Sequence, residues 1–339
     1  MLGGRGTGAL RALPLLAVLF VTACSGAGSA SSAVTRAPGS SSTATADSLP
    51  DEPVDGHLLY WRTERHDSQA FLRLDDEGEH QLTQPDTFCC LMRVSPDREH
   101  ILTMPVEDLS PVTGGTIGID GSGPFEPLHL LDPTLNLVPQ AWSPDGSRIA
   151  FEGWDDTDPT RTGAYVANTD GTGLVRVTER PGIPHDAPLD FSPDGTQVVV
   201  YRAGTENDSQ TGGELWVSNV DGSEAHVVAD TSAHPGFWAR WSPDGSRIIF
   251  SEERTLPTGR IWTVRPDGSE MTEFYEDPDG GFAINPVWSP DGSEVFFALD
   301  PTNDEFEHPD NVLAVVDADG RDMRVVDDSP GFKSSQEWY

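Results

Sequence analysis

One six-residue phrase, Trp-Ser-Pro-Asp-Gly-Ser, recurs down the chain and constrains its fold more than any other feature. It stands intact at 142–147, 241–246 and 288–293, with a close variant at 191–196 and a degenerate copy at 94–98. The aspartates of the five copies are separated by 48, 49, 50 and 47 residues. A period in this range, with one sheet-forming unit per repeat, is typical of a radial β array.

Each repeat has the composition of four short strands. An aromatic residue ends one strand, the Ser-Pro-Asp-Gly turn follows, and a β-branched or aromatic run such as 148–151 or 247–250 begins the next strand. In the turn, proline presets φ and glycine accepts the positive φ that disfavours other residues. A second turn, exemplified by Asp170-Gly171 and Asp221-Gly222, lies about two dozen residues later between two further strands. Four antiparallel strands are the content of one propeller blade.

The two ends of the repeat region predict how the array closes. One more step of 50 residues from Trp288 reaches Trp338, so the last inner strand has no strands after it. Three strands are expected at the other end, over 57–61, 71–74 and 80–82. The sequence therefore predicts an all-β, six-bladed β-propeller over 56–339, closed by pairing of the N- and C-terminal strands within one four-stranded antiparallel blade.

The repeated phrase resembles the TolB-type propeller repeat, a WD-like motif that also occurs beside the catalytic domains of prolyl oligopeptidases and acylpeptidases. The resemblance covers 56–339 and implies a propeller scaffold. TolB carries an α/β domain before its propeller, whereas a low-complexity stretch precedes this one, and we expect no hydrolase domain to accompany it. No Gly-x-Ser-x-Gly nucleophile elbow occurs in the sequence, so the resemblance does not imply a hydrolase.

The first 23 residues have the pattern of a bacterial lipoprotein signal peptide. Arg5 and Arg11 precede a short apolar run, and Val21-Thr22-Ala23-Cys24 resembles a lipobox, which implies diacylation of Cys24. The alternative is an ordinary secretory signal with a chance cysteine. Residues 24–55 would then form a lipidated, flexible tether, because 20 of the 24 residues in 25–48 are Ser, Ala, Thr or Gly. These features predict a propeller held at the extracytoplasmic face of the cell membrane by its lipid anchor.

The charge of the chain limits its partners. The sequence has 56 acidic against 21 basic residues and a formal net charge of −35. Nucleic acid and anionic lipid are excluded as partners on electrostatic grounds, whereas cations, basic proteins and neutral glycans are compatible. The alternative explanation is solubility, since many aspartates stand in turns that favour them. We expect a monomer without a cofactor.

The adjacent cysteines Cys89 and Cys90 allow two interpretations. An exported protein could form a vicinal disulfide, although neighbouring Cα atoms lie closer together than a disulfide prefers. The other interpretation is a pair of small buried thiols.

Candidate binding residues precede the inner strands, where loops of several blades are expected to meet at a propeller mouth. They are His185, Asp186, His234, Asp277, Asp279 and Asn285. These residues could hold Ca²⁺, which prefers oxygen ligands, or the histidines could serve a lyase-like or hydrolase-like reaction. They could also be solvated loop residues. Arg240, just before Trp241, points either into the channel or into a structural ion pair.

Three functions remain compatible with the sequence. The favoured one is a non-enzymatic scaffold that binds an envelope protein or a cell-wall ligand, since TolB, which the repeat resembles, is an interaction hub of the envelope. The alternative is an extracellular enzyme acting on glycans, with its site at the histidine-bearing mouth. The third is a structural ring stiffened by calcium.

Overall fold

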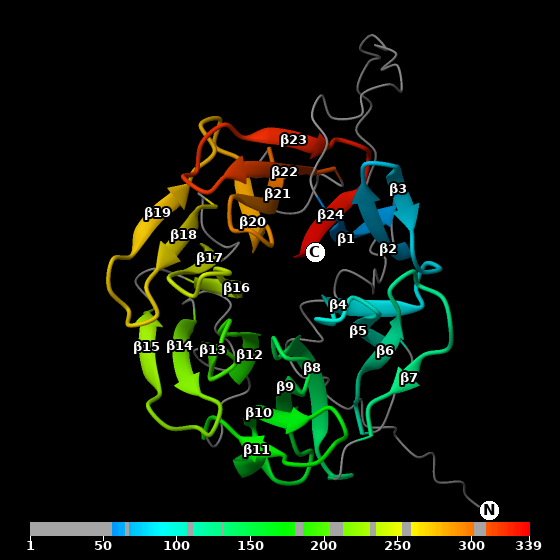
Figure 1. Cartoon of the computed structure of the whole chain (residues 1–339), viewed down its shortest axis with the longest axis vertical. Helices are drawn as coiled ribbons and strands as arrows, with labels where there is room; N and C mark the ends of the chain where they lie inside the picture. Colours follow the sequence, from blue (N-terminus) through cyan, green and yellow to red (C-terminus); the bar gives the residue numbers. More distant parts are fainter. Residues whose placement is uncertain are drawn as a thin grey trace, which may run out of the picture.

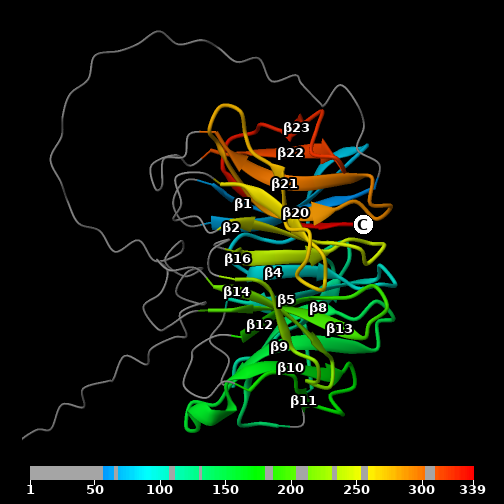
Figure 2. The ribbon, with the colours of Figure 1, turned by 90° about the vertical axis from the view of Figure 1, so that its left-hand side faces the viewer.

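The computed structural model describes residues 56–64, 68–106, 111–129, 132–179, 186–203, 213–230, 235–252, 259–301 and 310–339. In these ranges the strands form six four-stranded antiparallel sheets, arranged as blades around a central axis (Figure 1). Seen from the side, the strands run roughly along the axis of the ring (Figure 2). The predicted all-β, six-bladed propeller is confirmed. None of the helical segments in the described ranges has the length and hydropathy needed to cross a membrane.

In each blade the innermost strand lies at one edge of the four-stranded sheet. The blade that closes the ring contains β24 (Phe332–Trp338), β1 (Leu58–Glu64), β2 (Ser68–Asp75) and β3 (Gly78–Gln81). The next two blades contain β4 (Phe88–Val94), β5 (His100–Pro105), β6 (Gly115–Gly118), β7 (Glu126–Pro127), β8 (Asn136–Trp142), β9 (Arg148–Trp154), a 3-10 helix η1 (Pro159–Arg161), β10 (Gly163–Asn168) and β11 (Val175–Arg176). The last three contain β12 (Asp186–Phe191), β13 (Gln197–Arg202), β14 (Glu214–Asn219), β15 (His226–Ala229), β16 (Pro235–Trp241), β17 (Ile248–Glu252), β18 (Ile261–Val264), β19 (Thr272–Tyr275), β20 (Phe282–Trp288), β21 (Glu294–Asp300), β22 (Val312–Asp317) and β23 (Arg324–Asp327).

The closing blade joins the two ends of the described chain, as the repeat spacing predicts. β1 pairs antiparallel with β24, so that Leu58 lies opposite Trp338. His57 N–H donates to the Tyr339 carbonyl at 2.8 Å, and Tyr339 N–H donates to the His57 carbonyl at 3.0 Å. Trp338 is buried and its ring contacts Phe296 of the neighbouring blade edge to face. This pairing completes the sixth blade from the two ends of the chain and so closes the ring.

The repeated turn is held by its own aspartate. In the copy at 143–147, Asp145 Oδ1 accepts hydrogen bonds from Ser143 Oγ at 2.6 Å and from Ser147 N–H at 3.0 Å. These hydrogen bonds lower the pKa of Asp145 to about 2. Gly146 takes a φ of +70°, which a side chain would oppose. The degenerate copy keeps this geometry at a cost, because Arg98 adopts a φ of +59° where the other copies have glycine.

Each inner strand carries a β-bulge or similar irregularity just before its last residues. The pairing register shifts between Pro139 and Ala141 in β8 and between Pro188 and Asp190 in β12, and corresponding shifts occur in β4, β16, β20 and β24. An extra residue in one strand reorients the side chains that follow it. The bulges thus determine which residues of the six inner strands face the propeller axis.

Candidate functional site

The residue before each repeat's aromatic position lies next to the axis, and four of the six such residues are charged. They are Arg93 in β4, Asp190 in β12, Arg240 in β16 and Glu337 in β24, and we call them the axial quartet. The neighbours Ala141 in β8 and Val287 in β20 occupy the other two places.

The positions of these strands place the two arginines on opposite sides of the axis. Inner strands contact one another in the order β4, β8, β12, β16, β20, β24 and back to β4, so β4 and β16 are three blades apart in either direction. β4 lies opposite β16, and β12 lies opposite β24 (Figure 1). Arg93 is therefore on the strand opposite Arg240, and Asp190 is on the strand opposite Glu337.

The two guanidinium groups donate hydrogen bonds to backbone carbonyls of residues that lie at the register shifts of neighbouring inner strands. Arg93 Nε donates to the Gln140 carbonyl at 3.1 Å, and Nη1 donates to the Gln336 carbonyl at 3.1 Å. Arg240 Nη1 donates to the Leu189 carbonyl at 3.3 Å. Each arginine thereby links its own inner strand to an adjacent one. Arg93 and Arg240 are 5% and 6% exposed, so these charges are held inside the ring.

Trp238 connects the arginines across the axis. It lies in the irregular segment of β16 that precedes Ala239, and both Arg93 and Arg240 place their guanidinium carbons 5.7 Å from the centre of its ring. Both contacts fall within the range of cation–π interactions. A side chain from β16 thus reaches Arg93 on the opposite blade.

The axial quartet has no formal net charge, but burial and the neighbouring charges shift the pKa values of its members. Burial and the like positive charge of Arg240 lower the pKa of Arg93 to about 9. Burial also raises the pKa of Asp190 and Glu337, and the two guanidiniums only partly offset that effect. Asp190 accepts hydrogen bonds from Phe191 N–H and Trp241 N–H, whereas the Glu337 carboxylate has no hydrogen-bond partner among the described residues.

Asp186, one of the predicted mouth residues, is a buried ion-pair partner. Its two carboxylate oxygens accept from Arg202 Nε and Nη2, both at 2.8 Å, and the two residues lie directly opposite each other in β12 and β13. Arg202 also lies 4.4 Å from the centre of the Trp216 ring. This arrangement holds the blade together and leaves Asp186 few free lone pairs for a ligand.

The other predicted mouth residues have separate environments. Buried Asp277 accepts from Gly281 N–H at 2.7 Å, whereas Asp279 is exposed. Asn285 is buried in the bulge of β20 with a φ of +57°, and its Nδ2 donates to Ser334 Oγ at 2.5 Å. His185 and His234 lie outside the described residues.

Cys89 and Cys90 lie in β4, but their side chains are outside the described part of the chain. Both the vicinal disulfide and the pair of thiols therefore stay predictions. The same holds for lipidation of Cys24 and for the signal peptide and tether, which precede the first described residue, Gly56.

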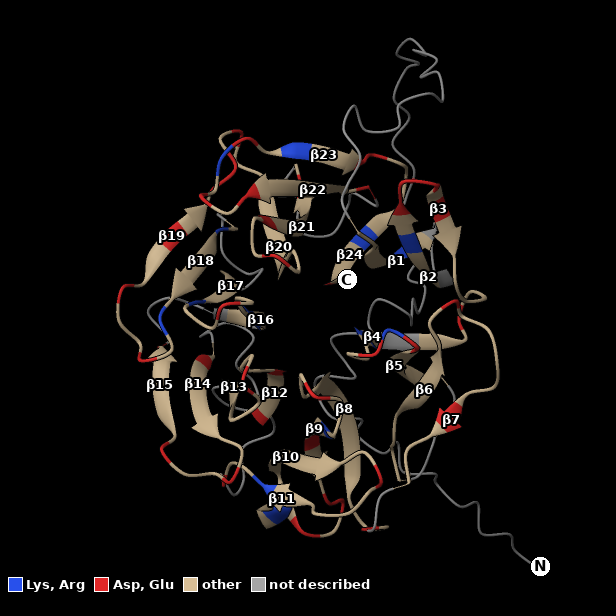
Figure 3. Ribbon diagram, viewed as in Figure 1, with Lys and Arg blue, Asp and Glu red and all other residues tan. Residues whose placement is uncertain are grey.

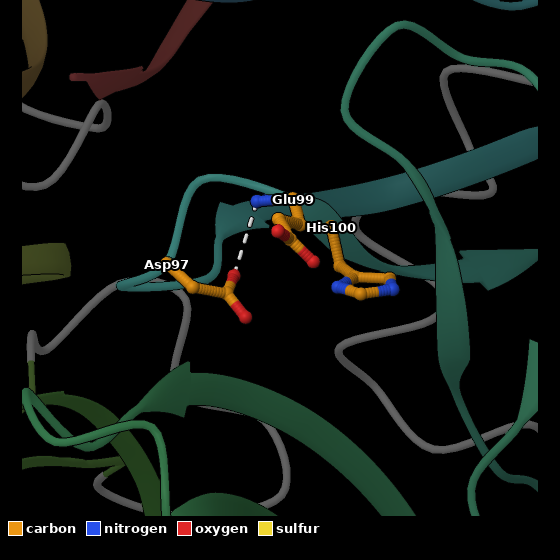
Figure 4. A group of neighbouring side chains, drawn as sticks. All are labelled: Asp97, Glu99 and His100. Carbon is orange, nitrogen blue, oxygen red and sulfur yellow. Dashed lines mark hydrogen bonds between the residues drawn. The ribbon is translucent and has the colours of Figure 1, made fainter.

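One group in the described ranges has the spacing of metal ligands. Asp97, Glu99 and His100 bring one ligand atom each to within 4.8 Å of one another (Figure 4). The group arises from the degenerate repeat, where Glu99 replaces the serine or threonine of the other copies. Asp97 Oδ1 is already engaged by Ser95 Oγ at 2.5 Å and Glu99 N–H at 3.0 Å. Three exposed or half-exposed ligands are fewer than the six to eight oxygens that calcium prefers.

Two cavities lie away from the axis, between the blades of β4–β7 and β8–β11. One, of about 300 Å³, is lined by His100, His129 and Trp142 among others. The other, of about 360 Å³, is lined by Asn136, Asp155 and neighbouring residues. Asp155 accepts from Thr157 N–H at 2.8 Å and from Arg161 Nη1 at 2.8 Å, and Asp156 accepts from Asn136 Nδ2 at 3.3 Å, so both carboxylates of the second cavity already have partners.

The six four-stranded blades around the charged axis define a β-propeller. A family model described as the TolB beta propeller domain matches residues 132–339. The chain belongs to this family. An uncharacterized protein of Agrobacterium fabrum, Atu1656, is 29% identical over 196 residues, which cover 55% of this chain and 59% of that protein. The chain thus spans about three fifths of that relative's length.

Solved structures with the same fold include proteins of different activities. TolB from Acinetobacter baumannii superposes with a TM-score of 0.60 at 15% identity, covering 84% of this chain and 66% of TolB. Oligogalacturonate lyase from Vibrio parahaemolyticus gives a TM-score of 0.53 at 14% identity, covering 76% of this chain and 70% of the lyase. Identities this low establish the fold alone.

Proposed function

We propose that this protein is a lipid-anchored propeller at the extracytoplasmic face of the cell membrane, where it binds a protein or cell-wall ligand without catalysing a reaction. The observation that carries the proposal is a closed ring with a charged axis. Arg93, Arg240 and Trp238 stand on inner strands and are fixed by contacts between blades, which supports a binding role because fixed side chains lose little entropy when a ligand binds. Membership in the TolB propeller family supports a binding role.

The anchor is tested by replacing Cys24 with alanine. The parent chain should take up radiolabelled palmitate and sediment with membranes, because two acyl chains hold a soluble domain stably. Cys24→Ala should incorporate no label and appear in the soluble extracytoplasmic or secreted fraction. A Cys24→Ala chain that sediments like the parent would show that the membrane attachment does not depend on lipidation.

An enzyme that acts on extracellular glycan is the second candidate. It is favoured by the fold shared with oligogalacturonate lyase and by His185 and His234, which precede two adjacent inner strands. This candidate predicts turnover of an acidic or neutral oligosaccharide on the order of 1 per second or more, abolished when both histidines are replaced by alanine. The scaffold proposal predicts no such turnover by the parent chain.

A further inference from the structure

Arg93 and Arg240 form an unusual pair, because two like charges face each other within the ring. Burial and then the like positive charge of Arg240 lower the pKa of Arg93, so holding both charges inside the ring costs free energy in the folded protein. No carboxylate of the described residues lies in direct ion-pair contact with either guanidinium. Asp190 and Glu337 act on them only at longer range.

Both arginines also have N–H groups that donate to none of the described protein atoms. Arg93 uses Nε and Nη1, and Arg240 uses Nη1, so the Nη2 group of each makes no hydrogen bond with the described protein atoms. Nε of Arg240 is buried without a partner. A guanidinium presents its donors in a fixed planar fork that matches a carboxylate. The two forks, joined by the Trp238 ring, thus have the chemistry to receive one anion between them.

We propose that the propeller axis binds a carboxylate group between Arg93 and Arg240, beside Trp238, and that charge on Glu337 and Asp190 weakens this binding. This proposal rests on the scaffold function and deepens it by naming the chemistry of the ligand. The carboxylate belongs either to a small organic acid or to the free C-terminus of a peptide, because both present the same planar anion to the arginines.

The inner strands of four blades supply the charged groups around the axis, and those of the other two blades supply uncharged residues. β4 and β16 supply the two arginines, and β12 and β24 supply Asp190 and Glu337. β8 and β20 contribute uncharged residues, Ala141 and Val287, at the same level. Protonation of the two acids therefore leaves two positive charges around the axis. Burial raises the pKa of both acids, so the affinity for an anion should rise as the pH falls through their titration range.

The test is calorimetric titration of the full-length chain with formate at pH 7.5 and pH 5.5. The parent should bind formate more tightly at the lower pH. Glu337→Gln keeps the shape of the side chain but removes one repulsive charge, so it should bind about fivefold more tightly than the parent at pH 7.5 and show a weaker pH dependence. Arg240→Met should lose binding at both pH values. Glu126→Gln in β7, an exposed residue of an outer strand, is the matched control and should behave like the parent.

Circular dichroism of each variant separates loss of binding from loss of folding. Glu337→Gln is expected to gain binding, and the Glu337 carboxylate makes no hydrogen bond with the residues that the structure describes, so a folding defect cannot imitate the expected result. Two outcomes would overturn the proposal: no formate binding to Glu337→Gln at either pH, or equal affinity of the folded Glu337→Gln and Glu126→Gln chains.

Peptide ligands distinguish the two sources of the carboxylate. Trialanine should compete with formate, whereas trialanine amide, which lacks the terminal carboxylate, should not. Trialanine binding at least about tenfold tighter than formate would assign the site to peptide C-termini, and equal affinities would assign it to small acids. Loss of the carboxylate site would leave the scaffold proposal open to its own test, capture of an envelope partner, so the two failures are distinguishable.

Discussion

Removal of the last four residues, Gln336 to Tyr339, should unfold the propeller or destabilise it far more than loss of a terminal tail normally does. Trp338 is 4% exposed and packs in a core cluster with Tyr60 and Phe296. Truncating a buried tryptophan costs about 3–5 kcal/mol. The deletion also removes the two hydrogen bonds between His57 and Tyr339, each worth about 1 kcal/mol.

The total, about 5–7 kcal/mol before strand pairing is counted, is comparable to the whole stability of many domains. Thermal unfolding followed by circular dichroism should show a melting temperature lower by at least about 10 °C, or no cooperative transition. Trp338→Phe, which retains the strand and an aromatic ring, should melt between the truncated and parent chains. A truncated chain that melts within about 3 °C of the parent would refute closure through β1 and β24.

Two further predictions concern charged groups that stabilise the fold. The turn carboxyls Asp145 and Asp291 have pKa values of about 2, below their unfolded value of 3.8, so their stabilisation is complete above about pH 5 and is lost as the pH falls toward 2. Urea midpoints should therefore fall from pH 5 to pH 2.5, and a flat profile would contradict the role of these turns. Asp186→Asn should cost about 3 kcal/mol in urea denaturation because it leaves Arg202 unpaired and largely buried. The exposed control Asp279→Asn should change stability by less than about 0.5 kcal/mol, and equal effects would contradict the difference in environment.

The blade count and the closure were predictable because both depend on local chemistry that repeats. Each Ser-Pro-Asp-Gly turn is made by its own side chains, as the hydrogen bonds of Asp145 show. Acidic residues consequently mark many of the turns around the ring (Figure 3). The spacing from Trp288 to Trp338 likewise located the last inner strand before any tertiary contact was known. Such signals survive in a single sequence because they need no information about distant residues.

The axial site was not predictable in the same way. Which side of an inner strand faces the axis depends on bulges that shift the register, and those bulges have no common sequence signal. From the sequence, Arg240 was a candidate for the channel or for a structural ion pair, whereas Arg93, Asp190 and Glu337 were not identified. The usable signal was the position just before each repeat's aromatic residue, compared across all six copies.

Asp186 illustrates the same limit at a predicted site residue. A charged residue before an inner strand has the pattern of a mouth residue, yet it pairs with Arg202, which lies opposite it across the hairpin. Counting back from the Ser-Pro-Asp-Gly turn without the bulge would place Ala187, not Asp186, opposite Arg202, so the ion pair was not predictable from the sequence. The ligand preference of the axis was not predictable either, since it depends on side chains from four separate blades.

The most direct test of the scaffold function is affinity capture from detergent-solubilised envelope of the source organism. The bait is the full chain with a tag inserted within residues 25–48, ahead of the ring, so that the closing strand β24 is untouched. The account predicts a protein or cell-wall fragment bound at about one per propeller and no turnover of extracellular glycans. An empty capture, together with glycan turnover at about 1 per second that depends on His185 and His234, would contradict it.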